Sequence, residues 1–171
     1  MKITLDTNCF NIRDNPELDQ IFDLADKREI FIFFVDALIY EVLSGKIKIE
    51  DLPEKKRENA RRRLEKAKKY KLIKSWQTFK NHYNTLPMRL GDSEFNEQIS
   101  DILFPHRKEK NGKYDEEDVR QIVAHFYEKN DIFITFNSRD FINGNRREEL
   151  QKLGIIVKTP KEFLTDFKGQ K

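Results

Sequence analysis

The sequence has a single cysteine, Cys9, and no apolar run long enough to cross a membrane. One cysteine excludes an internal disulfide, which fits a reducing compartment. The longest apolar run, Ile30–Val35, is far shorter than the roughly 20 residues that a membrane-spanning helix needs. A secretory signal is not expected, because Asp6 interrupts the apolar stretch at the N-terminus. These absences predict a cytoplasmic protein with no membrane partner.

Several common catalytic motifs are also missing from the sequence. It has no glycine-rich phosphate-binding loop, and its three histidines, His82, His106 and His125, lack the spacing of metal ligands. Cys9 follows the first expected strand, where its thiol could act as a nucleophile. The simpler interpretation is a small side chain packed at a helix start. A two-domain enzyme acting on a small molecule is disfavoured, because no cofactor motif is present.

Charge is distributed unevenly along the 171 residues, of which 37% are charged and 37% hydrophobic. This length and composition predict one domain with a core and a heavily charged surface. Between Lys55 and Lys74 there are eleven Lys or Arg and two Glu, a local charge of +9, so the rest of this +3 chain sums to −6. A basic segment beside an acidic remainder suggests a polyanion that approaches an acidic centre.

Hydrophobic patterning alternates between strand-like and helix-like segments, which predicts an α/β domain with a parallel sheet. We treat residues 1–171 as one domain, with a helical insertion from about Leu52 to Phe104 and a loop at Phe104–Lys113. Strands are predicted at Lys2–Leu5, Ile30–Val35, Ile132–Phe136 and Ile155–Val157, with a weaker signal at Leu72–Trp76. Helices are predicted at Glu17–Asp26, Ala37–Leu43, Glu54–Lys71, Glu94–Leu103, Glu116–Glu128, Arg146–Leu153 and Pro160–Phe167.

Four acidic residues at the ends of apolar runs are the candidate site: Asp6, Glu41, Asp118 and Asp140. Carboxylates at the carboxyl ends of parallel strands can meet at one sheet edge, and such a cluster binds a divalent cation. Each residue also has a simpler interpretation. Asp6 can cap a helix, Glu41 can be a solvated helical residue, and Asp140 can belong to a polar turn. Asp118 and Asp115 can each favour a helix start, and we prefer Asp118 for the site because it lies one turn before Ile122.

The spacing of these blocks resembles that of a known family. The blocks are Leu5-Asp6-Thr7-Asn8, Glu41-Val42-x-x-Gly45, Asp118 at a helix start, and Phe133-Ile134-Thr135-x-Asn137-x-x-Asp140-Phe141. In this combination the chain resembles the PIN domain family of metal-dependent nucleases. The resemblance covers residues 1 to about 45 and about 115 to 160, and no motif covers the middle third.

The resemblance implies a three-layer α/β/α fold in which four acidic residues bind Mg²⁺ or Mn²⁺. Carried over to this sequence, Asp6, Glu41, Asp118 and Asp140 are the catalytic and metal-binding set. Asn8, Thr135, Asn137 and Asp115 are supporting residues. Many family members have an Asp where this chain has Asn137, so Asn137 and Asp140 remain alternatives for the position nearest the metal.

The basic segment offers contacts for nucleic-acid phosphates, which give salt-dependent and largely sequence-independent affinity. The candidate RNA-binding residues are Arg61, Arg62, Arg63, Lys68 and Lys69. Two alternatives are a solvated helix and a docking site for an acidic protein partner such as an antitoxin.

We therefore expect a Mg²⁺- or Mn²⁺-dependent endoribonuclease that hydrolyses single-stranded or structured RNA. The resemblance is compatible with the toxin of a bacterial toxin–antitoxin pair, often a homodimer. The long basic insertion is equally compatible with a housekeeping or defence nuclease. The alternatives are a non-catalytic PIN module that binds RNA or protein, and a nuclease that acts on DNA.

Overall fold

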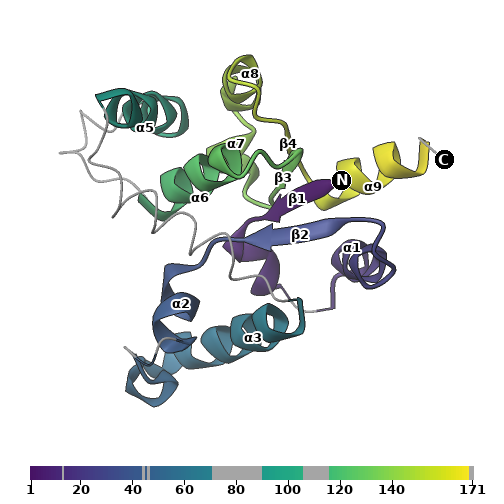
Figure 1. Ribbon diagram of the computed structural model, residues 1–171, viewed down its shortest axis with the longest axis vertical. Coiled ribbons are helices and arrows are strands. Elements are labelled where there is room, and N and C mark those ends of the chain that lie inside the picture. Colours follow the sequence, from purple (N-terminus) through teal and green to yellow (C-terminus); the bar gives the residue numbers. More distant parts are fainter. Residues whose placement is uncertain (13, 44, 46, 71–89, 106–115, 170–171) are drawn as a thin grey trace.

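The computed structural model describes residues 1–12, 14–43, 45, 47–70, 90–105 and 116–169. Its centre is a four-stranded, all-parallel sheet in the order β2-β1-β3-β4 (Figure 1). The strands are β1 (Lys2–Leu5), β2 (Phe31–Phe34), β3 (Ile132–Ile134) and β4 (Val157–Lys158). In the register, Thr4 of β1 lies opposite Phe33 on one side and Phe133 on the other.

Eight α-helices and two short 3-10 helices accompany the sheet in the described part of the chain. The 3-10 helices are η1 (Thr7–Phe10) and η2 (Ile49–Asp51). The α-helices are α1 (Pro16–Asp26), α2 (Ala37–Leu43), α3 (Glu54–Tyr70), α5 (Leu90–Leu103), α6 (Glu116–Tyr127), α7 (Ser138–Phe141), α8 (Arg146–Lys152) and α9 (Pro160–Gly169). Figure 1 shows α1, α2 and α3 on one side of the sheet and α5, α6, α7 and α8 on the other. The expected three-layer α/β/α architecture fits this arrangement.

Strand residues alternate between two hydrophobic cores, one on each face of the sheet. Ile132 and Ile134 of β3 pack in the core that also holds residues of α1 and α9. Phe133, between them, points to the opposite core beneath α5, α6 and α8. Because both faces are covered, every residue of this strand is buried, and the strand reads as a continuous apolar run rather than an alternating one.

Local signals place most element boundaries within one or two residues of the prediction. The Asp36 side chain caps α2 by accepting the Ile39 N–H at 3.1 Å, and Gly45, with a φ of +74°, follows the end of that helix. The last strand is shifted toward the C-terminus from the predicted Ile155–Val157. The Ile155 N–H still donates to Leu150 at the end of α8, so sheet pairing begins later. The predicted strand Leu72–Trp76 and residues 106–113 of the predicted loop lie outside the described residues.

A polar cluster lies inside the otherwise apolar core between β1 and α6. His125 is buried, and its Nδ1 lies 2.9 Å from the Thr4 hydroxyl, which also accepts a hydrogen bond from Asn130 Nδ2 at 2.8 Å. The His125 ring packs edge-on against Phe133. Burial lowers the pKa of His125 from 6.5 to about 4, with a smaller opposing effect from Asp131. The folded protein therefore holds this imidazole in its neutral form.

Neutral burial of His125 predicts a loss of stability in mild acid. Since the folded-state pKa lies below the unfolded value, the unfolded chain takes up a proton first as the pH falls from 6.5 toward 4. The shift corresponds to about 3 kcal/mol. In denaturant titrations across this pH range, wild type should lose free energy of unfolding relative to His125→Phe, which cannot titrate at this position. Parallel curves for the two proteins would contradict the prediction.

Candidate functional site

The carboxyl end of β1 lies at the point where the chain order across the sheet reverses. From β1 the chain passes to β2 on one side and later returns to β3 on the other. In open parallel sheets, ligands bind at such a switch point, beyond the carboxyl ends of the strands. Asp6 is the first residue after β1, and its N–H donates to the carbonyl of Ile134, the last residue of β3. The sequence therefore delivers a carboxylate to the switch point.

The Asp6 carboxylate is fully buried and held by neutral donors. The Thr135 hydroxyl donates to Asp6 Oδ2 at 2.6 Å, the Thr7 hydroxyl lies 3.3 Å from Oδ1, and the Asn8 N–H donates to Oδ1 at 3.2 Å. The bond from Asn8 also makes Asp6 the N-cap of η1, so the capping role and the site position coincide. Burial raises the pKa of Asp6 above its usual value of 3.8, and the hydrogen bonds from Thr135, Asn8 and Thr7 oppose that rise.

A hollow of about 420 Å³ opens beside this carboxylate, and we call it the edge hollow. Its wall includes the residues that follow β1, β2 and β3, together with the start of α6 and one face of α3. Asp6 is not a lining residue itself, but its carboxylate accepts hydrogen bonds from Thr7 and Asn8, which line the wall. The lining residues are Thr7, Asn8, Asp36, Leu38, Lys56, Arg63, Glu117, Asp118, Asn137 and Asp140.

Thr135, Asn137 and Asp140 converge after β3 as predicted. The Thr135 hydroxyl, which donates to Asp6, also accepts the Asn137 N–H at 2.8 Å. The Asn137 side chain caps α7 by accepting the Asp140 N–H at 3.3 Å, and its Nδ2 donates to Asp140 Oδ2 at 2.9 Å. Asn137 and Asp140, the two alternatives for the position nearest the metal, therefore both line the edge hollow. The Asn137 side chain holds the Asp140 carboxylate in place.

Asp118 enters the edge hollow from the first turn of α6 and is buried. One turn further on, Gln121 is also buried, accepts the Thr7 N–H at 3.0 Å and places its Nε2 3.3 Å from the Thr7 hydroxyl. Sequence reasoning missed Gln121. The available signal was the spacing of Asp118, Gln121 and His125 on one face of a helix whose other inward residues are apolar. We call these three residues the polar stripe of α6.

Glu41 lies in α2 and is partly buried, but it is not a lining residue of the edge hollow. Asp36, five residues earlier at the start of α2, lines the hollow instead. Arg63 Nη1 lies 3.1 Å from Asp36 Oδ2, and the Asp36 side chain is only 2% exposed. Burial raises the pKa of Asp36 above its usual value, and the Arg63 guanidinium opposes that rise.

The predicted RNA-binding residues of α3 face different directions. Arg63 lines the edge hollow, and Lys56, which belongs to the predicted basic segment but not to the five named candidates, joins it there. Arg62 donates to the Asn11 carbonyl at 2.8 Å and lies 3.3 Å from Glu58, while Lys69 pairs with Asp26 at 3.2 Å. Arg61 and Lys68 are exposed.

Within the described residues, no group of three or more His, Cys, Asp or Glu side chains is arranged to hold a metal ion. Asp115, the alternative to Asp118, lies outside those residues. The edge hollow nevertheless brings oxygen donors of two kinds together. Carboxylates come from Glu117, Asp118 and Asp140, besides Asp36, which pairs with Arg63, and amide oxygens come from Asn8 and Asn137.

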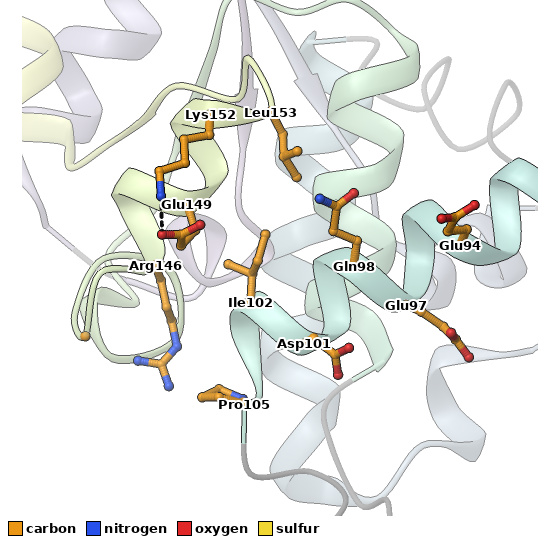
Figure 2. A pocket seen from close by; sticks show the side chains of 11 residues that line it. Glu94, Glu97, Gln98, Asp101, Ile102, Pro105, Arg146, Glu149, Lys152 and Leu153 are labelled. Atoms are coloured by element: carbon orange, nitrogen blue, oxygen red, sulfur yellow. Dashed lines mark hydrogen bonds and ion pairs between the residues drawn. The ribbon is translucent and has the colours of Figure 1, made fainter.

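A second hollow, of about 680 Å³, lies between α5 and α8 and shares no residue with the edge hollow. Figure 2 shows Glu97 and Asp101 projecting from α5, apart from the pair that Lys152 and Glu149 form on α8 at 2.6 Å. Arg146 is also engaged, because it donates to the carbonyls of Leu103 and Asn143. This second hollow is lined by charged side chains, but it lies away from the switch point.

No family model matches the chain, and neither the curated proteins nor the solved structures yield a match. In the part of the chain that the structure describes, each helix is too short or too polar to span a membrane.

The Thr135 hydroxyl should be one of the most sensitive single groups at the sheet edge. Thr135→Val keeps the shape but removes a donor to Asp6 and the acceptor of the Asn137 N–H, so we expect a loss of about 1.5–3 kcal/mol in unfolding free energy near neutral pH. Without Thr135 the folded-state pKa of Asp6 should rise further. Because the folded-state pKa of Asp6 is already above 3.8 in wild type and higher still in the variant, this part of the deficit is complete above the variant's pKa and is lost as the pH falls to the wild-type pKa.

The matched control is Thr165→Val, which removes an exposed hydroxyl bonded to the Lys161 carbonyl and should cost less than about 0.5 kcal/mol. Equal losses in the two variants, or a Thr135→Val deficit that does not change with pH, would contradict this account of Asp6.

Proposed function

We propose that the protein is a divalent-metal-dependent nuclease of the PIN type that hydrolyses RNA at the edge hollow. The observation that carries the proposal is the position of Asp6. It is a buried carboxylate at the switch point of a parallel sheet, adjacent to a hollow lined by two further Asp side chains from the first turns of α6 and α7. Ligand sites of open α/β sheets occur at this location.

The donor set suits Mg²⁺ or Mn²⁺. Both are hard cations that take oxygen ligands, and Mg²⁺ keeps several waters while binding through one or two carboxylates. Asp118 and Asp140 are the carboxylates for direct binding, and Asn8 and Asn137 add amide oxygens. Asp6 would supply negative charge from behind, since the hydrogen bonds described for its carboxylate come from neutral groups. Glu41 remains a predicted member of the set that does not line the hollow.

A bound divalent ion would supply an activated water and neutralise charge that develops on the phosphate. The protein's own groups have separate tasks. Asn137 and Thr135 orient the carboxylates through the hydrogen bonds described above. Gln121 fixes the start of α6, and therefore Asp118, against the end of β1. RNA is the proposed substrate because the basic helix α3 borders the acidic hollow and can attract a polyanion.

A second candidate function is a non-catalytic module that binds RNA or a protein partner. The observation that favours it is the complete burial of Asp6, whose carboxylate is already satisfied by hydrogen bonds within the chain. A purely structural carboxylate would have these properties too. The two functions differ in whether phosphodiester hydrolysis accompanies binding.

Cleavage of a labelled single-stranded RNA should require Mn²⁺ or Mg²⁺ and should be lost in Asp118→Asn and Asp140→Asn. Each substitution removes a carboxylate from the edge hollow while keeping the side-chain shape. Asp23→Asn, an exposed change on α1, is the control and should cleave at the wild-type rate. RNA binding without metal-dependent cleavage would shift the assignment to the binding module.

A divalent ion should also stabilise the fold. Carboxylates gathered at one edge repel one another, with two unit charges at 4 Å costing about 4 kcal/mol at an effective dielectric of 20. We expect Mn²⁺ to raise the melting temperature of wild type in proportion to the logarithm of its concentration, as ligand linkage requires. The shift should be strongly reduced in Asp118→Asn and retained in Asp23→Asn. An equal shift in all three proteins would indicate that the ion binds elsewhere.

A further inference from the structure

One face of α3 forms part of the edge hollow. Lys56 and Arg63, which are seven residues apart and therefore two helical turns apart on the same face, both line it. Arg61 and Lys68 point in another direction and are exposed. The positive charge of the basic helix is thus divided, and only part of it lines the hollow to which Asp118 and Asp140 also contribute.

Arg63 is held in a defined orientation by two partners. Its Nε donates to Asn11 Oδ1 at 2.9 Å, and its Nη1 donates to Asp36 Oδ2 at 3.1 Å. The side chain keeps 20% of its surface exposed, so the guanidinium is not closed off. Within the described residues, no hydrogen bond is made by Nη2. A guanidinium fixed in this way is pre-organised for an anion, because little conformational entropy remains to be lost on binding.

Asp36 is occupied on both oxygens. Oδ1 accepts the Ile39 N–H as the cap of α2, and Oδ2 accepts from Arg63. This carboxylate therefore has a different task from Asp118 and Asp140: it orients the guanidinium. Lys56 complements Arg63, since its side chain is exposed at the rim and its ammonium makes no hydrogen bond or ion pair within the described residues. A flexible ammonium at the rim can follow a phosphate that Arg63 binds at a set position.

We infer that Lys56 and Arg63 form a phosphate clamp that binds an RNA backbone phosphate over the edge hollow, with Asp36 as the positioning residue for Arg63. The inference rests on the proposed function for the identity of the polyanion. It replaces the broad prediction of RNA contact along the whole helix with contact at one face. The clamp also explains how an acidic hollow can accept an anion, because its two cations come from α3, whereas Asp118 and Asp140 come from α6 and α7, which lie on the other side of the sheet in Figure 1.

Salt dependence of RNA binding tests the clamp without requiring cleavage. A labelled single-stranded RNA is titrated with the full chain in EDTA, where metal-dependent cleavage cannot occur, over a range of salt concentrations. Each lost phosphate contact should weaken binding about tenfold at low salt and reduce the slope of log K against log salt by about 0.7. We expect both effects for Lys56→Gln and for Arg63→Gln. Lys161→Gln, an exposed change on α9, is the charge-matched control and should leave both values unchanged.

Arg63→Gln breaks a buried ion pair and can lower stability, whereas Lys56→Gln removes an exposed side chain and should fold normally. Lys56→Gln therefore keeps the test decisive. Arg63→Lys keeps the positive charge but loses the two hydrogen bonds that orient the guanidinium. This variant should recover the wild-type slope of log K against log salt but not the full RNA affinity. Equal weakening by Lys56→Gln and Arg61→Gln would overturn the clamp, because affinity would then be spread along the helix.

Cleavage assays separate failure of the clamp from failure of the proposed function. If wild type never cleaves RNA but Lys56→Gln and Arg63→Gln bind it more weakly, the clamp stands and the nuclease assignment fails. If wild type cleaves RNA with Mn²⁺ and both variants retain its KM and kcat, the nuclease assignment stands and the clamp is overturned.

Discussion

Burial of the Asp6 carboxylate at the end of the central strand is the constraint around which the neighbouring structure is organised. An ionised carboxylate removed from water is costly unless donors surround it, and burial raises the pKa of Asp6 for this reason. The chain supplies donors from η1 and from the residue after β3. Asp6 therefore ties the ends of β1 and β3 together at the switch point of the sheet, where small shifts would leave a charged group unsatisfied.

The elements around Asp6 carry polar side chains where apolar ones would pack more simply. The polar stripe of α6 places Gln121 on Thr7 and His125 on Thr4, so that helix is aligned along β1 by two polar contacts. On the other side, Arg63 links α3 to Asp36 and Asn11. Buried polar contacts of this kind specify a position, because each misplaced donor or acceptor costs more than a misplaced methyl group. The alignment determines which side chains reach the edge hollow.

The resulting site has two walls of opposite charge. Carboxylates and amides after β1 and β3 and at the start of α6 form one wall, and the cations of α3, with Asp36 bound to Arg63, form the other. A cation and an anion could occupy such a hollow together, each against the wall of opposite charge. This arrangement is what a metal-dependent phosphodiesterase needs, and it links the proposed nuclease function to the proposed clamp. It also suits a module that binds a phosphate backbone without hydrolysing it.

Much of the fold follows from the sequence alone, since strand runs, helix periodicity and caps such as Asp36 are local properties of the chain. The sequence also indicated Asp6, Asp118, Asn137 and Asp140 as site residues, because each stands where an apolar run ends or a helix begins. Only the tertiary structure decided the strand order, and with it the switch point at Asp6. It also decided that Asp36 and Lys56 line the site, while Glu41 does not line it and the basic residues of α3 are divided between faces. These outcomes depend on how helices distant in sequence pack against the sheet, and no local pattern encodes that.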